Sequence, residues 1–558
     1  MLAIIPDPTH IQTSDANPFR LSASTRILVP TADLAPLTTL FSSQLHRLAG
    51  MTVDVIEGEI ADESPVIRLE LAADTPDMLA LPETGGTRTD GGDPNVERYS
   101  LAIREDGIRI RAAHPEGVYR GLTTLLQLSA TTSQELDGTV SLPAVEIADA
   151  PRFAWRGLSF DVARTFFQVE EVKRVIDLLT LYKANVLHLH LTDSEGWRIE
   201  IDAWPLLTQI GGQSAAGNRP GGFYTKDDYR EIVRYAAARF ITIVPEFDMP
   251  GHTAAIYRAC PELAGDGVDA ATADLERAAW FQVMHPDHPH IFSFVTDVLT
   301  EISELTPGAY LHIGGDEALG MDGDLYRRFV EQVMPIVKGL GKKVVGWQET
   351  ARAGVATGDI AQLWISPKLG DLAGDVANID PNDLPEGFEL PPFDDALIAA
   401  FTDMLKLAAG DLDKALEQGA NILVSQSTSA YLDTKYSEPP SDPTQEADWA
   451  RLGMPFYPKS TVAEYFAWDP ATIRPGLHED RIVGVEAGIW CETIQTFDDL
   501  LFMLLPRLPG LFEKGWSPAV PDADAWAGYA PRLVAQTPIW DRHGWVYFRS
   551  SVVWPREP

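Results

Sequence analysis

The sequence predicts an α/β protein in which a parallel (β/α)8 TIM barrel, residues 151–558, follows a smaller α+β domain, residues 1–150. Three observations support this prediction. Eight short apolar runs follow residue 151, with crossover-length segments between them. Those runs are apolar almost throughout, as in parallel strands buried on both faces, whereas the earlier runs alternate. The length of 558 residues accommodates both units.

The first 150 residues contain strand and helix patterns in alternation. Residues 24–30, 65–71 and 107–112 alternate polar with apolar side chains, which predicts half-exposed strands. Residues 34–48 and 115–128 show the helical apolar period. The strands carry no converging set of polar side chains, so we expect this domain to be an accessory with a structural role. A stretch rich in Gly, Asp and Thr, residues 83–94, is expected to be a loop.

The barrel prediction depends on strands that can be counted. The expected strands are residues 158–162, 186–191, 241–247, 310–314, 343–347, 360–364, 421–425 and 482–490. Crossover helices are clearest at residues 169–182, 226–238 and 324–340. One spacing is irregular, because residues 368–419 form a long acidic segment before the seventh strand. We interpret this segment as an insertion on the barrel.

Composition excludes several classes of protein. Hydrophobic residues make up 45% and charged residues 22%, which is typical of a folded globular protein. The 81 acidic and 44 basic residues give a formal net charge of −37, which repels phosphate backbones and anionic lipid. We therefore expect neither a nucleic-acid partner nor a membrane partner. A neutral ligand is easier to accommodate.

Cysteine usage and the amino terminus bear on the compartment. The two cysteines, Cys260 and Cys491, are too few and too far apart for a disulfide framework or a cysteine metal cluster. No apolar stretch approaches the length of about 18 residues that spans a bilayer. The amino terminus lacks a basic segment and reaches Pro6 before an apolar stretch develops. These features predict a cytoplasmic protein, with secretion as the alternative if a signal was removed.

The ends of the predicted strands are unusually rich in polar and aromatic side chains. In (β/α)8 barrels the active site lies at the carboxyl ends of the strands. Most of these ends present a carboxylate here, and three present a tryptophan: Trp347, Trp364 and Trp490. A single buried acid usually pairs with an arginine, and a single tryptophan usually belongs to the core. Together they predict a concave sugar site, where indoles stack on C–H faces and carboxylates accept from hydroxyls.

Asp316 and Glu317 are the most specific local feature. They follow Gly314 and Gly315, and two adjacent acids in a partly apolar pocket should raise the pKa of one of them. A retaining glycosidase of the usual kind needs a second carboxylate about 5 Å away across the bond, and adjacent residues are poorly placed for that. Attack by the substrate's own acetamido oxygen needs one acid and one neighbour that orients the acetamide. The pair fits this route better.

Two alternatives use the same residues differently. His188 and His190 share one strand face, and with His252, His312 and Asp316 they resemble the ligands of a metal-dependent barrel hydrolase. That hypothesis leaves the tryptophans unexplained, and hydrogen bonds to acids account for the histidines without a metal. A non-catalytic carbohydrate-binding barrel would keep the aromatic walls but lose the acid after the fourth strand. Glu317 is the acid at that position, and its presence argues against this alternative.

Motifs along the chain resemble those of the glycoside hydrolase family 20 β-N-acetylhexosaminidases, in the family's order. The resemblance implies an exo-acting, retaining enzyme that removes terminal β-linked N-acetylglucosamine or N-acetylgalactosamine by substrate-assisted catalysis. It implies a glycan or chitooligosaccharide as substrate. It implies no metal and no organic cofactor. The motifs are residues 156–157 with 161–164, 188–193 with 196–198, 249–252, 312–317, 346–349, 431–433 and 490–492.

The resemblance also implies a role for individual residues. Glu317 would be the general acid/base, and Asp316 would orient the acetamide and stabilise the oxazolinium that forms. Asp193 and His252 would tune the acid. The residues expected to bind the sugar are Tyr431 on the acetamide oxygen, Trp347, Trp364 and Trp490 as pocket walls, Arg164 on O3 and O4, and Asp433 and Glu492 near O4 and O6.

The sequence departs from the family pattern at a few positions. Thr165 and the pair Ser194-Glu195 stand where many members carry His and Asp-Gln, which affects how the site is positioned. Family members usually have one more tryptophan between the Tyr431 motif and the last strand. Trp449 is the expected candidate here, and Trp468 is the alternative.

Overall fold

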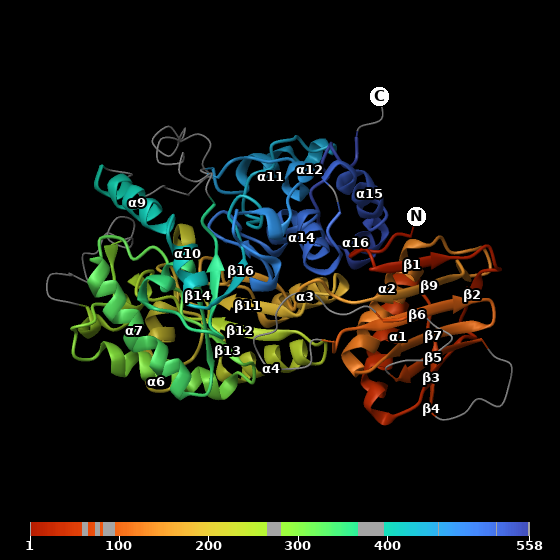
Figure 1. Cartoon of the computed structure of the whole chain (residues 1–558), viewed down its shortest axis with the longest axis horizontal. Helices are drawn as coiled ribbons and strands as arrows, with labels where there is room; N and C mark the ends of the chain where they lie inside the picture. The colour runs from red at the N-terminus through yellow and green to blue at the C-terminus, as the bar shows by residue number, and fades with distance from the viewer. Residues whose placement is uncertain are drawn as a thin grey trace.

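The computed structural model describes most of the chain in detail (Figure 1). Within the described residues, every helix is too short or too polar to span a bilayer. Both cysteines are buried and free. The described residues are 2–57, 65–72, 79–81, 95–264, 281–366, 395–455, 457–520 and 522–555.

The amino-terminal domain is a mixed seven-stranded sheet in the order β1-β9-β6-β7-β5-β3-β4, with helices α1 and α2 packed on it. A two-stranded sheet, β2 with β8, completes it. The predicted strands correspond to β3, β5 and β7 and the predicted helices to α1 and α2, while the predicted loop at 83–94 lies outside the described residues. The elements are β1 His10–Thr13, β2 Phe19–Leu21, β3 Arg26–Val29, α1 Ala35–Ala49, β4 Asp54–Glu57, β5 Val66–Leu71, β6 Tyr99–Arg104, β7 Gly107–Ala112, α2 Pro115–Thr131, β8 Val140–Leu142 and β9 Val145–Asp149.

Eight parallel strands, β10 to β17, form a closed barrel in sequence order, and β10 pairs with β17 to close it. This confirms the predicted fold class. Every predicted strand overlaps one of these eight, although the fourth is only three residues long. The strands are β10 Trp155–Asp161, β11 Val186–His190, β12 Thr242–Glu246, β13 Tyr310–His312, β14 Lys343–Trp347, β15 Ile360–Leu363, β16 Asn421–Val424 and β17 Ile482–Ile489.

Helices surround the barrel and extend beyond its last strand. The three predicted crossover helices are present as α3, α4 and α7. Of the predicted insertion, residues 367–394 lie outside the described residues, and α9 and α10 follow them. The helices are α3 Val169–Leu181, α4 Lys226–Ala237, α5 Ala254–Ala259, α6 Ile291–Leu305, α7 Gly323–Gly339, α9 Asp395–Ala408, α10 Asp411–Glu417, α11 Glu446–Arg451, α12 Val462–Phe466, α13 Phe497–Leu504, α14 Arg507–Trp516, α15 Asp522–Val534 and α16 Thr537–His543.

The barrel interior changes character along its axis. Inward side chains alternate along each strand, so Val186 and Val244 are followed on the inner face by His188 and Glu246. The apolar ones form a separate cluster with Trp155, Tyr310, Val345, Ile360, Leu423 and Val483. Most of the next positions are polar and buried, unlike the branched apolar layers that fill most such barrels: His188, Glu246, His312, Gln362, Ser425 and Glu486. This polar layer lies directly beneath the strand ends.

A buried carboxylate joins the two units of the chain. Asp149, the last residue of β9, lies 2.9 Å from the ammonium of Lys183, which precedes β11. The hydroxyl of Tyr99 donates to Asp149 at 2.7 Å, and the indole of Trp516 donates to it at 3.0 Å. Helix α16 also packs against α1 and α2, at one side of the amino-terminal domain (Figure 1).

Candidate active site

The loop after β13 carries Asp316 and Glu317 in a conformation that needs its two glycines. Gly314 and Gly315 have φ of 65° and 109°, and a Cβ on Gly314 would lie 1.8 Å from an oxygen of Asp248. Glu317 is itself in the left-handed region at φ 46°, which is rare for a residue with a side chain. Strain of this kind persists where the surrounding structure enforces it, often at functional sites.

His252 lies between this acid pair and a second carboxylate. Its Nε2 is 3.5 Å from Oε2 of Glu317 and 3.7 Å from Oδ2 of Asp316, and its Nδ1 is 3.2 Å from Oδ1 of Asp193. Burial disfavours the imidazolium, but Asp193 and Asp248 raise the pKa of His252 well above its usual value. A positive charge therefore lies beside the acid pair.

Asp316 has a raised pKa and an unsatisfied oxygen. Burial raises the pKa of Asp316 to about 6, with His252 opposing the rise and Glu317 adding to it. One carboxyl oxygen of Asp316, Oδ1, is buried without a hydrogen-bond partner among the described residues. That oxygen is available to an N–H of a ligand. The predicted crowding of the pair thus contributes to the raised pKa of Asp316, after the larger effect of burial.

Four aromatic rings gather beside the acid pair, as the sequence predicted for Trp347, Trp364, Tyr431 and Trp490. The ring centroids of Trp347 and Trp490 are 5.9 Å apart, and those of Tyr431 and Trp490 are 5.8 Å apart. Trp364 and Tyr431 lie parallel, with 2° between their planes and centroids 6.5 Å apart. Their faces form the walls of an apolar enclosure.

Two buried carboxylates fix the indoles in place. The Nε1 of Trp347 donates to Oε1 of Glu246 at 2.9 Å, and the Nε1 of Trp364 donates to Oε2 of Glu349 at 3.2 Å. Burial raises the pKa of Glu349 to about 8, with Arg352 opposing the rise. Hydrogen bonds to Glu246 and Glu349 therefore fix the orientation of the Trp347 and Trp364 indoles.

Sequence reasoning missed one aromatic residue. Tyr457 packs edge-on against Tyr431, with centroids 5.8 Å apart and 87° between the planes. Trp449 instead donates to the backbone oxygen of Tyr436 at 3.0 Å, and Trp449 and Trp468 pack on the main hydrophobic core. In the sequence, the only indication was the glycine at position 453, shortly before Tyr457. In the structure this glycine has φ of 90°, which lets the backbone approach Asp433 closely. The family pattern predicts a tryptophan in this part of the chain, so it does not indicate a tyrosine.

Arg164 and two acids form the polar side of the site. Arg164 extends over the ring of Trp490, 5.4 Å from its centroid. Both carboxyl oxygens of Asp433 and Oε2 of Glu492 are buried without hydrogen-bond partners among the described residues. Burial raises the pKa of Glu492 to about 7, with Arg164 opposing and Asp161 adding to the rise. Unsatisfied acceptors of this kind match the hydroxyl donors of a ligand.

Arg164 is held by several carboxylates. Its Nη2 lies 2.7 Å from Asp193, and its Nε lies 3.0 Å from Glu195, one of the residues that depart from the family pattern. Thr165, another departure, donates its hydroxyl to the backbone oxygens of Cys491 at 2.9 Å and Ile494 at 2.7 Å. These contacts join the loop after β10 to the loop after β17. The departures are therefore part of the scaffold around Arg164.

The predicted histidine set is divided between two places. His188, His190 and His312 surround Glu246 inside the barrel, whereas His252 lies with the acid pair. Both ring nitrogens of His188 lie within 3.0 Å of a carboxylate, and so do both of His190. Hydrogen-bonded ion pairs thus account for these two histidines.

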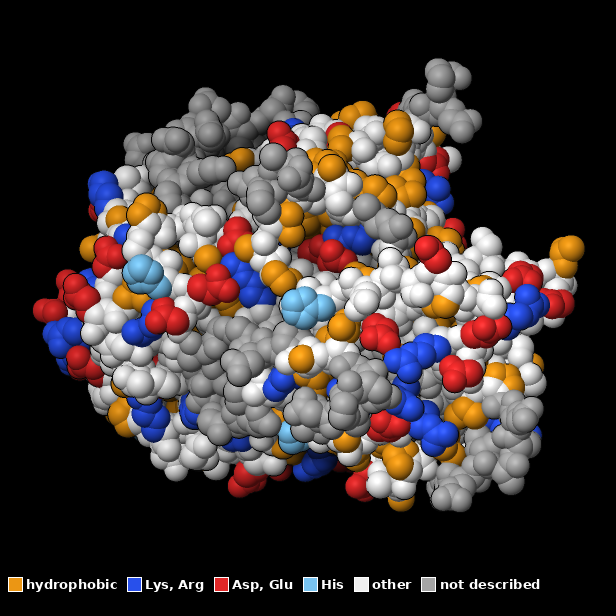
Figure 2. Space-filling model, turned by 45° about the vertical axis from the view of Figure 1, so that its right-hand side comes forward, with side chains coloured by type: hydrophobic (Ala, Val, Ile, Leu, Met, Phe, Trp, Pro, Cys, Tyr) orange, Lys and Arg blue, Asp and Glu red, His pale blue; other side chains and the backbone are white. Residues whose placement is uncertain are grey.

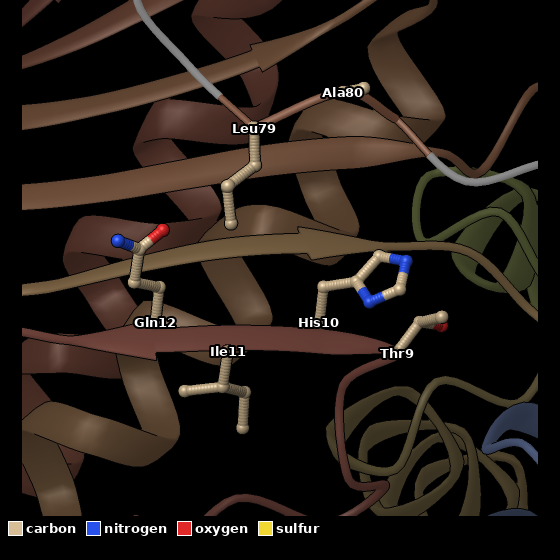
Figure 3. Close-up of a pocket in the computed structure, with 6 residues that line it drawn as sticks. All are labelled: Thr9, His10, Ile11, Gln12, Leu79 and Ala80. Atoms are coloured by element: carbon tan, nitrogen blue, oxygen red, sulfur yellow. The ribbon is translucent and has the colours of Figure 1, made fainter.

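A depression in the amino-terminal domain lies apart from these groups (Figure 3). It borders the exposed edge strand β1, and the side chains of His10 and Gln12 lie on one side of the strand with Ile11 on the other. Its described lining residues are Thr9, His10, Ile11, Gln12, Leu79 and Ala80. Acidic and basic side chains are interspersed over the face shown in Figure 2.

Comparisons with known proteins agree with this geometry. The model for "Glycosyl hydrolase family 20, catalytic domain" matches residues 153–379 and 394–519, and the model for domain 2 of that family matches residues 1–150. A β-N-acetylhexosaminidase from Cellulomonas fimi is 38% identical over 99% of this chain and 97% of its own length.

Solved structures are similar over the whole chain. The β-N-acetylhexosaminidase from Streptomyces coelicolor A3(2) has a TM-score of 0.80 at 35% identity and covers 100% of this chain and 98% of its own. A mutant of the Streptomyces plicatus β-hexosaminidase, in complex with the product GlcNAc, has a TM-score of 0.81 at 34% identity with the same coverage.

Proposed function

The chain belongs to glycoside hydrolase family 20, and from that premise we propose the role of each residue in the site. The protein is a β-N-acetylhexosaminidase of the class EC 3.2.1.52, and its family uses substrate-assisted catalysis. Its substrate is a carbohydrate. Our proposal concerns the sugar that occupies the site and the groups that act on it.

Glu317 is the general acid/base. In the first step its carboxyl proton passes to the glycosidic oxygen while the acetamido oxygen of the sugar attacks the anomeric carbon. The bond to the leaving group breaks and an oxazolinium ring forms. In the second step Glu317 takes a proton from water, and the water oxygen attacks the anomeric carbon and opens the ring. Two inversions leave the configuration retained. The proximity of His252 at 3.5 Å supports this role.

Asp316 orients the acetamide and stabilises the charge that develops on it. Its carboxylate accepts the acetamide N–H, which turns the carbonyl oxygen toward the anomeric carbon and offsets the positive charge of the oxazolinium. Support comes from the buried Oδ1, which has no partner among the described residues. This role needs the ionised form of Asp316.

The aromatic enclosure holds the acetamide group. Trp347, Trp364 and Trp490 enclose its methyl group, and the hydroxyl of Tyr431 donates to its carbonyl oxygen. Burial of Tyr431 and Trp347, which are 2% and 0% exposed, supports a pocket that excludes water. A hydroxyl in place of the acetamide would leave this apolar space empty, so the enclosure favours the acetamido sugar.

The polar side binds the remaining hydroxyls of a terminal N-acetylglucosamine or N-acetylgalactosamine. Arg164 donates to O3 and O4, and Asp433 and Glu492 accept from O4 and O6. Asp193 and His252 tune the acid from behind. The unsatisfied oxygens of Asp433 support this assignment. We further propose that residues 1–150 are an accessory domain, and that residues 151–558 form the catalytic domain with an insertion at about 368–419.

The observation that carries the proposal is the adjacent Asp316 and Glu317 beside His252 and the aromatic enclosure. The test is release of nitrophenol from aryl β-N-acetylglucosaminide and from aryl β-glucoside, with Glu317→Gln and a chelator as controls. We expect cleavage of the acetamido sugar alone, loss of activity in the variant and no effect of the chelator. Equal cleavage of the glucoside would refute the assisted route, and loss of activity with chelator would favour a metal hydrolase.

A further inference from the structure

We propose that Glu246 is a positioning residue that connects the acetamide enclosure to the residues that tune the acid, an inference that rests on the proposed function. Glu246 lies in the buried polar layer of the barrel and is 0% exposed. It contacts the pocket wall Trp347 directly and the other sugar-binding groups only through intervening side chains, and the mechanism above does not use it. Its two oxygens contact two different parts of the site.

The first oxygen holds the wall of the enclosure. Oε1 of Glu246 accepts from Nε1 of Trp347 at 2.9 Å, and Trp347 packs against Trp490. Nothing else in the described residues is recorded as accepting from this indole N–H. The plane of the indole is therefore fixed by the position of the carboxylate.

The second oxygen begins a chain of contacts that ends at the acid. Oε2 of Glu246 lies 2.5 Å from Nδ1 of His190, whose Nε2 lies 2.9 Å from Oδ2 of Asp193. Asp193 in turn lies 2.7 Å from Arg164 and 3.2 Å from His252, which lies 3.5 Å from Glu317. Three side chains, His190, Asp193 and His252, thus separate Glu246 from Glu317. Two of them, His190 and Asp193, separate Glu246 from Arg164.

His190 transmits the position of Glu246 because both of its nitrogens face carboxylates. Burial alone would lower the pKa of His190, but Glu246 and Asp193 raise it well above its usual value. The imidazolium therefore donates in both directions and fixes the distance between the two carboxylates.

Strand register places the two histidines directly beside Glu246. His190 on β11 and His312 on β13 are the registered neighbours of Glu246 on β12, and Trp347 ends β14. The titratable groups that contact Glu246 are His188 and His190 from β11 and His312 from β13. A carboxyl oxygen of Asp248, just after β12, also lies within 4.8 Å. Beyond these imidazoles lie Asp193 and Glu486.

A buried carboxylate could instead serve only to stabilise the barrel, and the chain offers a matched control. Glu486 on β17 is also 0% exposed. It accepts from the indole of Trp155 at 2.7 Å and from the amide of Gln362 at 2.9 Å, and lies 2.9 Å from His188. Trp155 belongs to the apolar layer away from the sugar site. Glu486→Gln therefore changes an equally buried carboxyl group that reaches Glu246 only through His188 and contacts none of the side chains from His190 to Glu317.

The test compares Glu246→Gln, Glu486→Gln and the unsubstituted protein on aryl β-N-acetylglucosaminides that differ in leaving-group pKa. Glu246→Gln should lower kcat by about 10- to 100-fold on a poor leaving group, because the acid loses its tuned environment. The loss should be smaller on a dinitrophenyl leaving group, which needs little protonation. Binding of an oxazolinium-like thiazoline should also weaken, because the Trp347 wall shifts.

Unfolding curves of both variants separate stability from function. We expect similar loss of stability in the two, with kinetics changed only in Glu246→Gln. Equal kinetic effects in both variants, or a loss in Glu246→Gln that does not depend on the leaving group and leaves thiazoline binding intact, would overturn the proposal. If Glu246→Gln does not fold, His190→Gln interrupts the same chain and should give the same dependence on the leaving group. Inactivity of the unsubstituted protein would refute the proposed function itself.

Discussion

His252 and Glu317 face each other across 3.5 Å, and both occupy the left-handed region of the backbone, at φ 55° and 46°. Each conformation is costly for a residue with a side chain, by roughly 1 to 3 kcal/mol. The loops after β12 and β13 approach closely here, since a Cβ on Gly251 would lie 3.1 Å from the backbone oxygen of Asp316. The distance between the imidazole and the carboxylate is thus set by two constrained backbones.

The first prediction uses this constraint. His252→Asn keeps a residue that tolerates the left-handed conformation but removes the imidazole. We expect kcat/KM on an aryl β-N-acetylglucosaminide to fall by about 10- to 100-fold, because Glu317 loses its charged neighbour. Circular dichroism should show an unchanged fold. His252→Ala, which adds backbone strain, should also lower the melting temperature, and an unaltered rate in His252→Asn would contradict a tuning role.

A second prediction follows from the pKa of Asp316, which burial raises to about 6. The ionised carboxylate is the form that stabilises the oxazolinium, so kcat/KM should decline as the pH falls below about 6. The check is a pH–rate profile of the unsubstituted protein. An acidic limb near pH 4 instead would show that Asp316 titrates as an ordinary carboxyl.

The same shift predicts a change in stability. Because the folded-state pKa of Asp316 lies above the value of 3.8 for an unperturbed carboxyl, the folded protein holds a proton that the unfolded chain has lost, and ionised Asp316 costs stability above pH 6. Asp316→Asn should therefore abolish activity yet raise the free energy of unfolding at pH 7 by roughly 1 to 3 kcal/mol. The gain should shrink toward pH 4. Asp403→Asn, on the exposed side of α9, is the control and should change neither property.

The fourth prediction concerns Tyr457, the aromatic residue that packs on Tyr431. Tyr457→Ala should raise KM for the aryl substrate about 10-fold, because Tyr457 packs on Tyr431. Trp449→Phe, which removes only the hydrogen bond to Tyr436, should leave KM within about 2-fold and lower stability by about 1 kcal/mol. If Trp449→Phe raised KM and Tyr457→Ala left KM unchanged, Trp449 would be the better candidate for the sugar site.

The fifth prediction addresses the junction of the two domains. Lys183→Met leaves Asp149 buried without its ammonium partner, which should cost about 3 kcal/mol of unfolding free energy in a urea titration. The kinetics of the folded protein should not change. Lys406→Met, which breaks an ion pair whose partners are 70% and 73% exposed, should cost less than about 0.5 kcal/mol. Similar costs in both variants would contradict the role of the junction.

The barrel was predictable because its strands are continuous apolar runs, which differ from helices in length and from half-exposed strands in period. The amino-terminal sheet was predictable only in part. Strand β1 has four exposed residues and β2 has three residues in all, so neither shows an apolar period. Strand β6 is buried along five of its six positions, and it lacks the alternation that identified its neighbour β7.

The site was predictable where its residues lie in short motifs, as Asp316 and Glu317 do. Contacts that depend on strand register were not. The motif that contains His188 and His190 does not specify that Glu246 lies between them and Trp347, because that follows from the alignment of β11, β12 and β14. Tyr457 lies in a loop with no motif of its own.

The junction at Asp149 has a consequence for the order in which the protein acquires its structure during translation. Tyr99 and Asp149 leave the ribosome first, Lys183 follows after β10 and α3, and Trp516 emerges much later, at the end of α14. Nascent domains generally fold in that order, from the amino terminus. The carboxylate of Asp149 therefore has all of these partners only after the whole barrel has been synthesised, and a helix made after the last barrel strand completes a junction whose first residues were made hundreds of residues earlier.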